Sequence, residues 1–245
     1  MAAIARSEPF RDQVCPLGVC DGSGWILGPE DVARPCECRA QRLSRGRSRG
    51  ISSVIPPRYR GASFDRPPVS DMARSLETKL AVSKVRDYVE SLDEQLSEGR
   101  GLWISGGTGT GKTTLAMLVS KAALEAGKTV AIYSLPKLLA RIRRTYDAEP
   151  GGESYLSFFE RLTSVDLLHI DDLGAEKRSD WVLEQLYALV NERYDARRSI
   201  LVTTNLTNPI ELEDQIGART VSRLAQMCVE LEVGGEDQRW RHQAA

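Results

Sequence analysis

A glycine-rich loop between a short apolar run and a helical pattern constrains this chain more than any other feature. Residues 106–113 read GGTGTGKT and match G-x-x-x-x-G-K-[ST] at every fixed position. The loop follows the apolar run 102–105 and opens a helical pattern that continues to residue 126. Backbone N–H groups of such a loop turn inward around phosphate oxygens, and the helix N-terminus adds a favourable dipole. The sequence therefore predicts a phosphate-binding loop (P-loop) for ATP.

Two side chains of the P-loop have the chemistry that a magnesium nucleotide needs. Lys112 supplies a positive charge for the β- and γ-phosphates, and the Thr113 hydroxyl is a ligand for Mg²⁺. The alternative is a glycine-rich turn without a ligand, which the strand–loop–helix context disfavours. The residues expected to contact ATP are Gly106, Gly107, Thr108, Gly109, Thr110, Gly111, Lys112, Thr113 and Thr114.

Short apolar runs alternate with helical patterns after residue 100. This alternation predicts an α/β fold, in which a parallel sheet carries helices on both faces. Ligands of such sheets lie beyond the carboxyl ends of the strands. The expected strands cover residues 102–105, 129–134, 165–171, 200–204 and 227–233, and the expected helices cover 112–126, 136–146, 153–162, 180–194 and 209–225, after a helical segment at 71–98.

A second apolar run, VDLLHIDD at residues 165–172, ends in two carboxylates, as a Walker B strand does. Asp171 is expected to hold Mg²⁺ through water, and Asp172 to act as the general base that polarises the attacking water. The alternative for Asp172 is a residue that only caps the following turn. A regular strand puts His169 on the same face as Asp171, but one histidine without a partner is interpreted as a packed strand residue.

Polar residues further along the chain are additional candidates. Asn205 follows the run 200–204 and would orient the attacking water or touch the γ-phosphate if this strand neighbours the Walker B strand; otherwise it only forms a turn. Arg219 and Arg223 lie four residues apart, so a helix presents both on one face. An arginine that reaches a γ-phosphate stabilises charge in the transition state, and the alternative is an ordinary surface ion pair.

Four of the five cysteines lie near the N-terminus and have the composition of a metal site. Cys15, Cys20, Cys36 and Cys38 offer four thiolates, enough for a closed tetrahedral Zn²⁺ site. A short segment with little apolar content needs such a metal to fold. The alternative is four reduced cysteines without a ligand. Cys228, inside a strand pattern, is expected to be buried.

Composition places the chain among soluble globular proteins. The formal net charge is −1, with 27% charged and 41% hydrophobic residues, so contact with nucleic acid would depend on local patches. No apolar run approaches the roughly 20 residues of a membrane helix, and the N-terminus lacks a signal peptide, so we expect a cytoplasmic protein with no membrane partner. The expected domains are a zinc module at 1–40, a basic linker at 41–70 and an ATPase domain at 71–245.

The helical segment LPKLLARIRRTY at residues 135–146 has one apolar and one basic face. Lys137, Arg141 and Arg144 lie opposite the apolar face, which consists of Leu135, Leu138, Leu139, Ile142 and Tyr146. The basic face indicates a contact with single-stranded DNA, and the alternative is the solvated side of a core-packed helix.

The P-loop, a strand ending IDDLG, a strand ending TTN, and then GARTVSRL and GEDQR occur in that order. Together they resemble the DnaC/DnaI-type bacterial helicase loaders over roughly residues 55–241. IstB, the transposition helper ATPase, is similar in much of this pattern. The P-loop alone is unspecific, whereas the ordered set is much more specific.

The resemblance implies an AAA+ ATPase core with five parallel strands and without a full C-terminal lid. Asn205 falls at the sensor-1 position, and Arg239, or else Arg241, at the sensor-2 position. Arg223 best matches the arginine finger, with Arg219 as the fallback. Such a finger acts on the ATP of a neighbouring subunit, so the resemblance also implies self-association through the ATP sites.

The implied function is ATP-dependent loading of a hexameric replicative DNA helicase onto single-stranded DNA, with the N-terminal module gripping the helicase. The alternative is an IstB-like transposition helper ATPase, although IstB-type chains usually lack a cysteine module. A small-molecule P-loop kinase is disfavoured by the candidate sensor and finger residues. A non-hydrolysing adaptor, with ATP as a switch, is a further alternative if Asp172 cannot activate water.

Overall fold

The computed structural model describes residues 15, 18–20, 25–27, 33–36, 54–147 and 152–237. The chain divides into two compact units, residues 1–50 and residues 51–245, which are described separately. In the first unit, β1 (Trp25–Leu27) and β2 (Ala33–Pro35) form an antiparallel pair with Ile26 opposite Arg34. Among the described residues, no helix has the length and apolar character that crossing a membrane requires.

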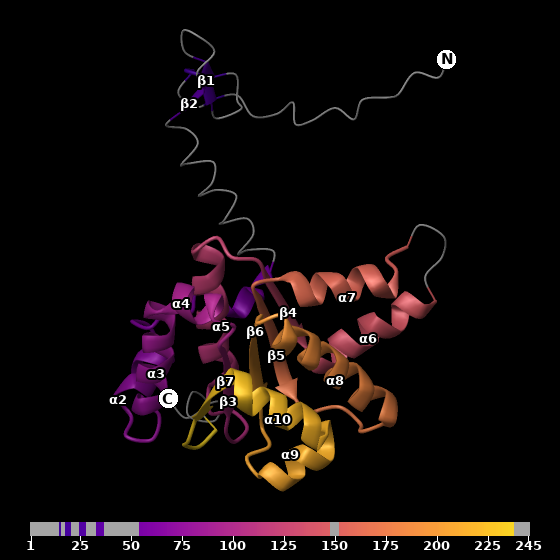
Figure 1. The fold of residues 1–245 in the computed structure, drawn as a ribbon. Helices are drawn as coiled ribbons and strands as arrows, with labels where there is room; N and C mark the ends of the chain where they lie inside the picture. Colours follow the sequence, from indigo (N-terminus) through magenta and orange to yellow (C-terminus); the bar gives the residue numbers. More distant parts are fainter. Residues whose placement is uncertain are drawn as a thin grey trace, which may run out of the picture. The chain divides into compact units, whose positions relative to one another are not determined.

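The second unit is built on a five-stranded parallel sheet with the strand order β4–β5–β6–β3–β7 (Figure 1). This confirms the predicted α/β class and the predicted number of strands. The strand expected at 165–171 differs from the structure in its bounds: β5 starts at Leu167 and continues past both carboxylates to Leu173, with an irregular register after Ile170. The strands are β3 (Gly101–Ser105), β4 (Val130–Ser134), β5 (Leu167–Leu173), β6 (Ser199–Thr204) and β7 (Cys228–Glu232).

Helices cover both faces of the sheet, as Figure 1 shows. Leu102 and Ile104 point into the core beneath α2 (Val69–Arg74), α3 (Lys79–Glu90), α4 (Leu92–Ser97) and α5 (Lys112–Glu125). Trp103, between them in β3, points into the core of the opposite face. That face is covered by α6 (Leu135–Tyr146), α7 (Tyr155–Ser164), α8 (Asp180–Asp195), α9 (Pro209–Ile216) and α10 (Ala218–Met227).

The segment expected as one helix at 209–225 is two helices. Gly217 interrupts it with φ 88° and ψ 135°, which a residue in an α-helix does not adopt. The start of α9 agrees with the expected helix boundary at residue 209. The Asn208 side chain accepts a hydrogen bond from the backbone N–H of Ile210, and Pro209 is the first residue of α9. The change of direction at Gly217 lets α10 pack along α8.

Part of the segment expected as a linker packs on the core of the second unit. Ile55 is 1% exposed and Val69 is completely buried. The 3₁₀ helix η2 (Pro57–Tyr59) lies between them. We use the name N-terminal strap for residues 54–72, which therefore include the end of the expected linker and the start of the helical segment after it.

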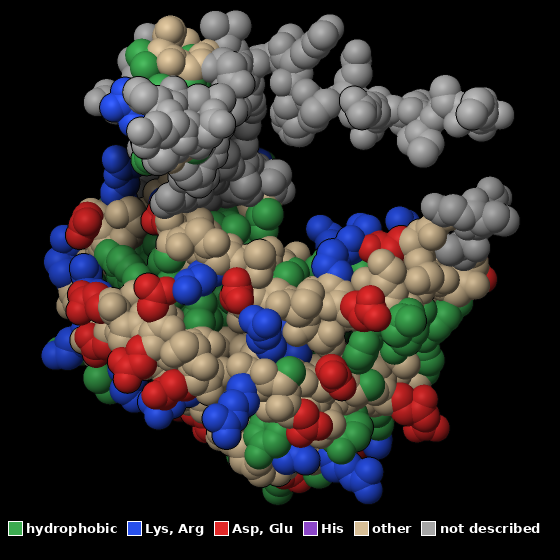
Figure 2. All heavy atoms as spheres, turned by 45° about the horizontal axis from the view of Figure 1, so that its top comes forward, with side chains coloured by type: hydrophobic (Ala, Val, Ile, Leu, Met, Phe, Trp, Pro, Cys, Tyr) green, Lys and Arg blue, Asp and Glu red, His purple; other side chains and the backbone are tan. Residues whose placement is uncertain are grey.

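Acidic and basic side chains alternate over the face in Figure 2, and neither sign covers a large continuous area there. This agrees with a net charge of −1. No histidine is visible on that face, and His169 is completely buried.

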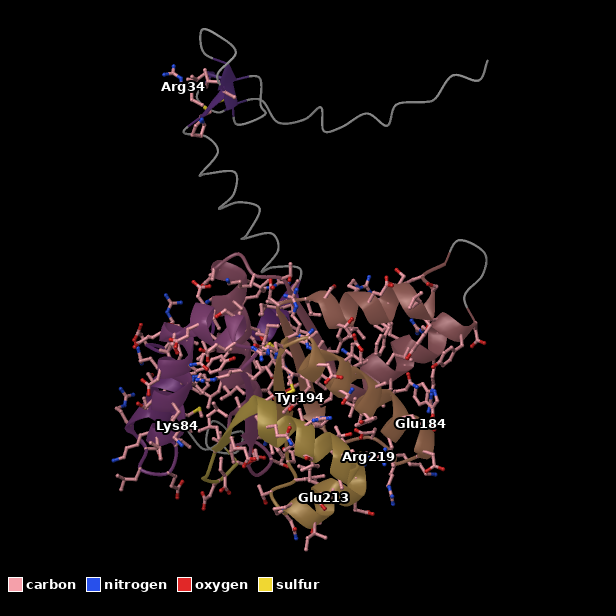
Figure 3. The ribbon with its side chains drawn as sticks, in the orientation of Figure 1. Arg34, Lys84, Glu184, Tyr194, Glu213 and Arg219 are labelled. Atoms are coloured by element: carbon pink, nitrogen blue, oxygen red, sulfur yellow. The ribbon has the colours of Figure 1, made fainter. Side chains whose placement is uncertain are left out.

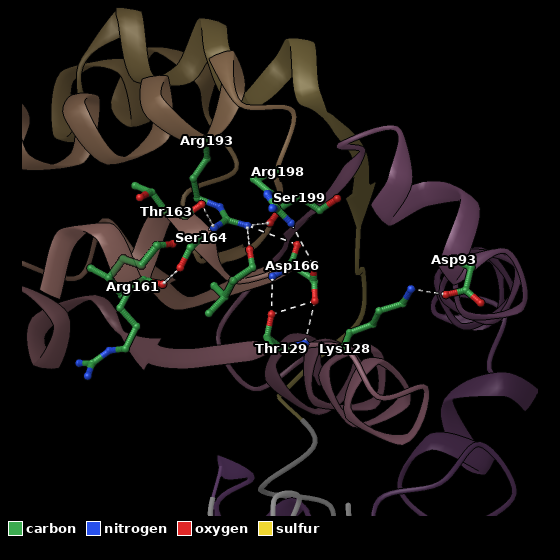
Figure 4. A network of polar contacts seen from close by, with 12 residues as sticks. Asp93, Lys128, Thr129, Arg161, Thr163, Ser164, Asp166, Arg193, Arg198 and Ser199 are labelled. Atoms are coloured by element: carbon green, nitrogen blue, oxygen red, sulfur yellow. Dashed lines mark hydrogen bonds and ion pairs between the residues drawn. The ribbon is translucent and has the colours of Figure 1, made fainter. Parts of the chain in front are cut away.

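Arg193 of α8 is a completely buried arginine that holds the chain entering β5 and β6 (Figure 4). Its guanidinium donates hydrogen bonds to backbone carbonyls, with distances of 2.7 Å to Leu162 and 3.0 Å to Val165. It also donates to the carbonyls of Thr163, Asp166 and Ser199. Burial lowers the pKa of Arg193 to about 9, so the group stays charged at neutral pH.

Replacing Arg193 with Met should lower the free energy of unfolding by about 3 kcal/mol. The replacement leaves several buried carbonyls without a donor, at a cost of about 1–3 kcal/mol each. It also removes the desolvation cost of the buried charge, which offsets part of this loss. Urea unfolding measures the change. Arg144→Ala, an exposed arginine of α6, is the matched control and should differ from the wild type by less than about 0.5 kcal/mol. An Arg193→Met protein as stable as this control would contradict the structural role.

Candidate functional site

The P-loop connects the end of β3 to the first turn of α5. Gly111 directly precedes α5 with φ 100°, a backbone conformation that favours glycine. A Cβ at Gly111 would lie 2.7 Å from the sulfur of Met72, and one at Gly106 would lie 2.2 Å from the carbonyl oxygen of Val233. The backbone conformation at Gly111 and the contact with the Val233 backbone at Gly106 therefore favour glycine at these two positions.

Lys112 carries a positive charge but is buried, with only 5% of the residue exposed. Its Nζ donates to the carbonyl oxygen of Gly107 at 2.6 Å, within the P-loop. The Thr110 hydroxyl donates to the same carbonyl at 3.0 Å. The ammonium group is thus held inside the loop, where a bound phosphate would offer it a stronger, charged acceptor.

A residue of the neighbouring strand β6 holds the Asp171 carboxylate and the backbone of Asp172 at the end of β5. The Thr203 hydroxyl donates to Oδ1 of Asp171 at 2.7 Å and accepts the backbone N–H of Asp172 at 2.9 Å. Asp171 is 8% exposed, and Asp172 has φ 57°, a left-handed conformation in which Asp and Asn are enriched. The two side chains therefore leave the strand with different backbone geometry.

Asn205 directly follows β6, the strand that lies between β3 and β5. This order places Asn205 between the P-loop and the carboxylates, as its proposed role requires. All three groups line one cavity of about 950 Å³. The predicted residues that line it are Thr108, Gly109, Gly111, Lys112, Thr113, Thr114, Asp171, Asp172 and Asn205.

The N-terminal strap forms a second wall of this cavity, which the sequence analysis missed. The strap contributes Arg58, Tyr59, Pro67, Pro68 and Met72. The sequence contains a signal for this packing, because apolar and aromatic residues recur between positions 54 and 72, and a flexible linker does not need them.

Tyr59 of the strap reaches the residues expected to bind the metal. Burial raises the pKa of its hydroxyl above the ordinary value. The positive charge of Arg58 and a side-chain hydrogen bond with Thr113 lower this pKa, whereas the negative charges of Asp171 and Asp172 raise it. The Arg58 guanidinium lies 4.6 Å from the centre of the Tyr59 ring. The strap therefore brings both an aromatic ring and a cation to the cavity.

His169 is packed as expected, but it also has polar neighbours. Its Nδ1 lies 2.9 Å from the Ser120 hydroxyl of α5, and its Nε2 lies 4.0 Å from Oδ1 of Asp171. Strand alternation thus does place His169 and Asp171 on one face. Burial lowers the pKa of His169 to about 3, so the imidazole is neutral at physiological pH.

Both candidate finger arginines belong to α10, which packs along α8. Figure 3 labels Arg219 of α10 and Tyr194 of α8. Arg223 donates to Oδ1 of Asn191 at 3.1 Å and lies 4.2 Å from the centre of the Tyr194 ring. Arg219 is exposed, one turn earlier. Neither lines the cavity of its own chain. Arg239 and Arg241 lie outside the described residues.

Three of the four clustered cysteines come together in the first unit. The Sγ atoms of Cys15, Cys20 and Cys36 all lie within 4.8 Å of one another. The distance between Cys15 and Cys36 is 4.0 Å, close to the edge of about 3.8 Å of a tetrahedron with Zn–S bonds of about 2.3 Å. Cys38 lies outside the described residues. Cys228 is half-buried at the start of β7, in the second unit.

The predicted basic face of α6 is exposed, and its apolar face is buried except for Tyr146, which is 53% exposed. Lys137, Arg141 and Arg144 line a hollow of about 700 Å³ that also includes Tyr133 and Glu153. Glu153 forms ion pairs with Arg141 at 3.0 Å and with Arg161 of α7 at 2.6 Å. One carboxylate therefore offsets part of the positive charge of this surface.

The cavity at the carboxyl ends of β3, β5 and β6 has the donor set of a magnesium–nucleotide site. Thr113 and Asp171 offer the hard oxygen ligands that Mg²⁺ prefers, and both line the cavity. Lys112 and the N-terminus of α5 supply positive potential for phosphates. Asp172 and Asn205 are the groups available to a water molecule at the γ-phosphate.

Comparisons with known proteins agree with this geometry. A family model described as IstB-like ATP binding protein matches residues 74–245. The replicative helicase loader DnaC of Escherichia coli (strain K12) is 29% identical over 77% of this chain and 71% of its own length.

Two solved structures share the fold. A crystal structure of the DnaC helicase loader has a TM-score of 0.61 at 25% identity and covers 73% of this chain and 99% of that chain. The structure of AMPPCP-bound DnaA from Aquifex aeolicus has a TM-score of 0.58 at 23% identity and covers 73% of this chain and 51% of that chain. These likenesses confirm the predicted AAA+ type of core.

Proposed function

The chain belongs to the family of IstB-like ATP binding proteins, and from this premise we propose that it is an ATPase that loads a hexameric replicative DNA helicase onto single-stranded DNA. The observation that carries the ATPase part is the single cavity that joins the P-loop, Asp171, Asp172 and Asn205. The helicase part rests on the similarity to the replicative helicase loader DnaC.

In this proposal the P-loop holds the triphosphate and Lys112 neutralises charge on the β- and γ-phosphates. Thr113 and Asp171 would hold Mg²⁺, which would supply further positive charge to the phosphates. Asp172 accepts a proton from the attacking water, and Asn205 orients that water. The γ-phosphoryl group passes to water, and the products are ADP and phosphate.

We propose that the remaining positive charge comes from a neighbouring subunit. Arg223 is the first candidate for this arginine finger and Arg219 the second, with Arg239 or Arg241 as sensor 2 in the same chain. Because neither α10 arginine lines its own cavity, action in trans through self-association fits their position. Arg223 would have to leave its contacts with Asn191 and Tyr194 to act, whereas Arg219 is already exposed.

We propose that residues 1–40 form a zinc module that grips the helicase and that the following basic segment joins it to the ATPase domain. The spacing of Cys15, Cys20 and Cys36 suits three of four tetrahedral ligands, and Cys38 is the fourth in this proposal.

We propose that single-stranded DNA contacts the basic face of α6. Lys137, Arg141 and Arg144 line one hollow, and such a patch is needed because a net charge of −1 gives no general attraction to a polyanion. Ion pairing with Glu153 reduces the contribution of Arg141. Arg144 is therefore expected to carry a larger share of the binding.

An IstB-like transposition helper is the second candidate, because the matching family model bears that name. The cysteine cluster favours the loader. A cofactor-bound adaptor without hydrolysis would keep the same cavity but would not turn ATP over.

Affinity purification from the source cell separates the two candidates. The tagged chain with ATP should recover a replicative helicase, and recovery of a transposase in its place would contradict the loader proposal. A separate test concerns the metal. Replacing both Cys36 and Cys38 with Ser should remove about one Zn²⁺ per chain, measured by mass spectrometry, and should abolish recovery of the helicase. Cys228→Ser, which alters a cysteine outside the cluster, is the matched control and should keep both zinc and helicase.

Salt-dependent titration of a labelled oligonucleotide tests the DNA contact. Replacing Arg141 and Arg144 with Ala should weaken binding and reduce the slope of log K against log salt by roughly 1 to 1.5, since each lost phosphate contact lowers it by about 0.7 for single strands. Arg74→Ala with Arg86→Ala, on the helices of the opposite face, is the matched control. Glu153→Gln should instead strengthen binding. Wild-type affinity and slope in the α6 variant would contradict the assignment.

A further inference from the structure

A histidine of the Walker B strand bridges the P-loop helix and the carboxylate expected to bind magnesium. His169 and Ser120 are both completely buried, and they belong to β5 and α5, respectively. The imidazole has one nitrogen against the Ser120 hydroxyl and the other toward Oδ1 of Asp171. An apolar side chain at this position would fill the same space but would make neither contact.

The surroundings of the ring determine which nitrogen carries the proton. A neutral imidazole has one N–H donor and one acceptor. With the proton on Nδ1, the lone pair of Nε2 would face the negatively charged Asp171 across 4.0 Å in a dry environment. With the proton on Nε2, the positive end of the N–H dipole faces the carboxylate, and Ser120 donates to Nδ1 at 2.9 Å. The second arrangement is electrostatically favoured.

Both buried neighbours of Asp171 act on the same carboxylate oxygen. Thr203 donates to Oδ1 at 2.7 Å, and Nε2 of His169 faces Oδ1 at 4.0 Å. At that distance the histidine contact is an electrostatic attraction rather than a hydrogen bond. Because both contacts engage Oδ1, the other carboxylate oxygen, Oδ2, is the candidate for a ligand in the cavity that Asp171 lines.

We propose that His169 is a positioning residue for Asp171, held by Ser120 in the tautomer that carries its proton on Nε2. In this role it keeps the Walker B carboxylate aimed at Mg²⁺. It also couples Asp171 to α5, the helix that supplies the second metal ligand, Thr113. The part of the inference that concerns Mg²⁺ rests on the proposed ATPase function, whereas the tautomer does not.

Nitrogen-15 NMR of histidine-labelled protein tests the tautomer without any nucleotide. The chain has two histidines, His169 and His242, and the His169→Gln variant assigns the buried one. The spectrum should show a protonated Nε2 and an unprotonated Nδ1 for His169. Ser120→Ala should shift the Nδ1 resonance, because its donor is lost. A protonated Nδ1 in the wild-type protein would overturn the proposal.

Magnesium titrations test the positioning role against simple packing. Loss of a group that orients a metal ligand typically costs tenfold or more in metal affinity. His169→Leu should therefore raise the Mg²⁺ concentration for half-maximal ATP turnover about tenfold, while the KM for ATP at saturating Mg²⁺ stays within about twofold. His169→Gln, whose amide can donate to Asp171, should restore most of the loss.

Thermal unfolding of both variants establishes that they are folded. A folded His169→Leu protein with the magnesium dependence of the wild type would reduce His169 to a packed residue and overturn the proposal. If the chain binds ATP but does not turn it over, the Mg²⁺ dependence of binding a non-hydrolysable ATP analogue is compared between the wild type and His169→Leu instead. A wild-type protein that binds no nucleotide contradicts the proposed function, and the NMR result then still tests the tautomer.

Discussion

The position of β6 between β3 and β5 is the constraint on which the site depends. Leu201 of β6 pairs with Leu102 on one side and with His169 on the other, so three strands end at the same edge of the sheet. Each strand end then contributes one part of the cavity: the P-loop from β3, Asp171 and Asp172 from β5, and Asn205 from β6. Thr203, one residue before the end of β6, donates a hydrogen bond to the Asp171 carboxylate and accepts one from the backbone N–H of Asp172.

Buried polar groups hold this arrangement at both ends of the strands. At the carboxyl end, Thr203 donates a hydrogen bond to Asp171, and Nε2 of His169, whose Nδ1 contacts Ser120, lies toward the same carboxylate oxygen. At the amino end, Arg193 bonds backbone carbonyls that lead into β5 and β6. Buried hydrogen bonds such as those of Thr203 and Arg193 favour one geometry, because a shift of the backbone would leave a donor or acceptor unpaired. The edge of the sheet that lines the cavity is therefore held from within the sheet as well as by the loops.

The elements that could be predicted from the sequence are those whose signals are local. The P-loop is flanked by its strand and helix, and the Walker B carboxylates directly end an apolar run, so both follow from adjacent residues. The contacts of the strap could not be derived in this way, because Met72 meets Gly111 and Tyr59 meets Thr113 only after the chain has folded. The partner of His169 is 49 residues away on another element, and therefore periodicity gave the face of the histidine but not its hydrogen bond.

The central claim is that one cavity of each chain binds and hydrolyses Mg·ATP and that a second chain completes it. ATP turnover by Lys112→Ala, by Arg223→Ala and by a mixture of the two tests this claim most directly. Each variant alone should be inactive, because the first loses the phosphate cradle and the second loses its finger, and the mixture should regain part of the wild-type rate at mixed interfaces. Wild-type turnover by a folded Lys112→Ala protein would contradict the site, and no recovery in proven mixed assemblies would contradict its completion by a second chain.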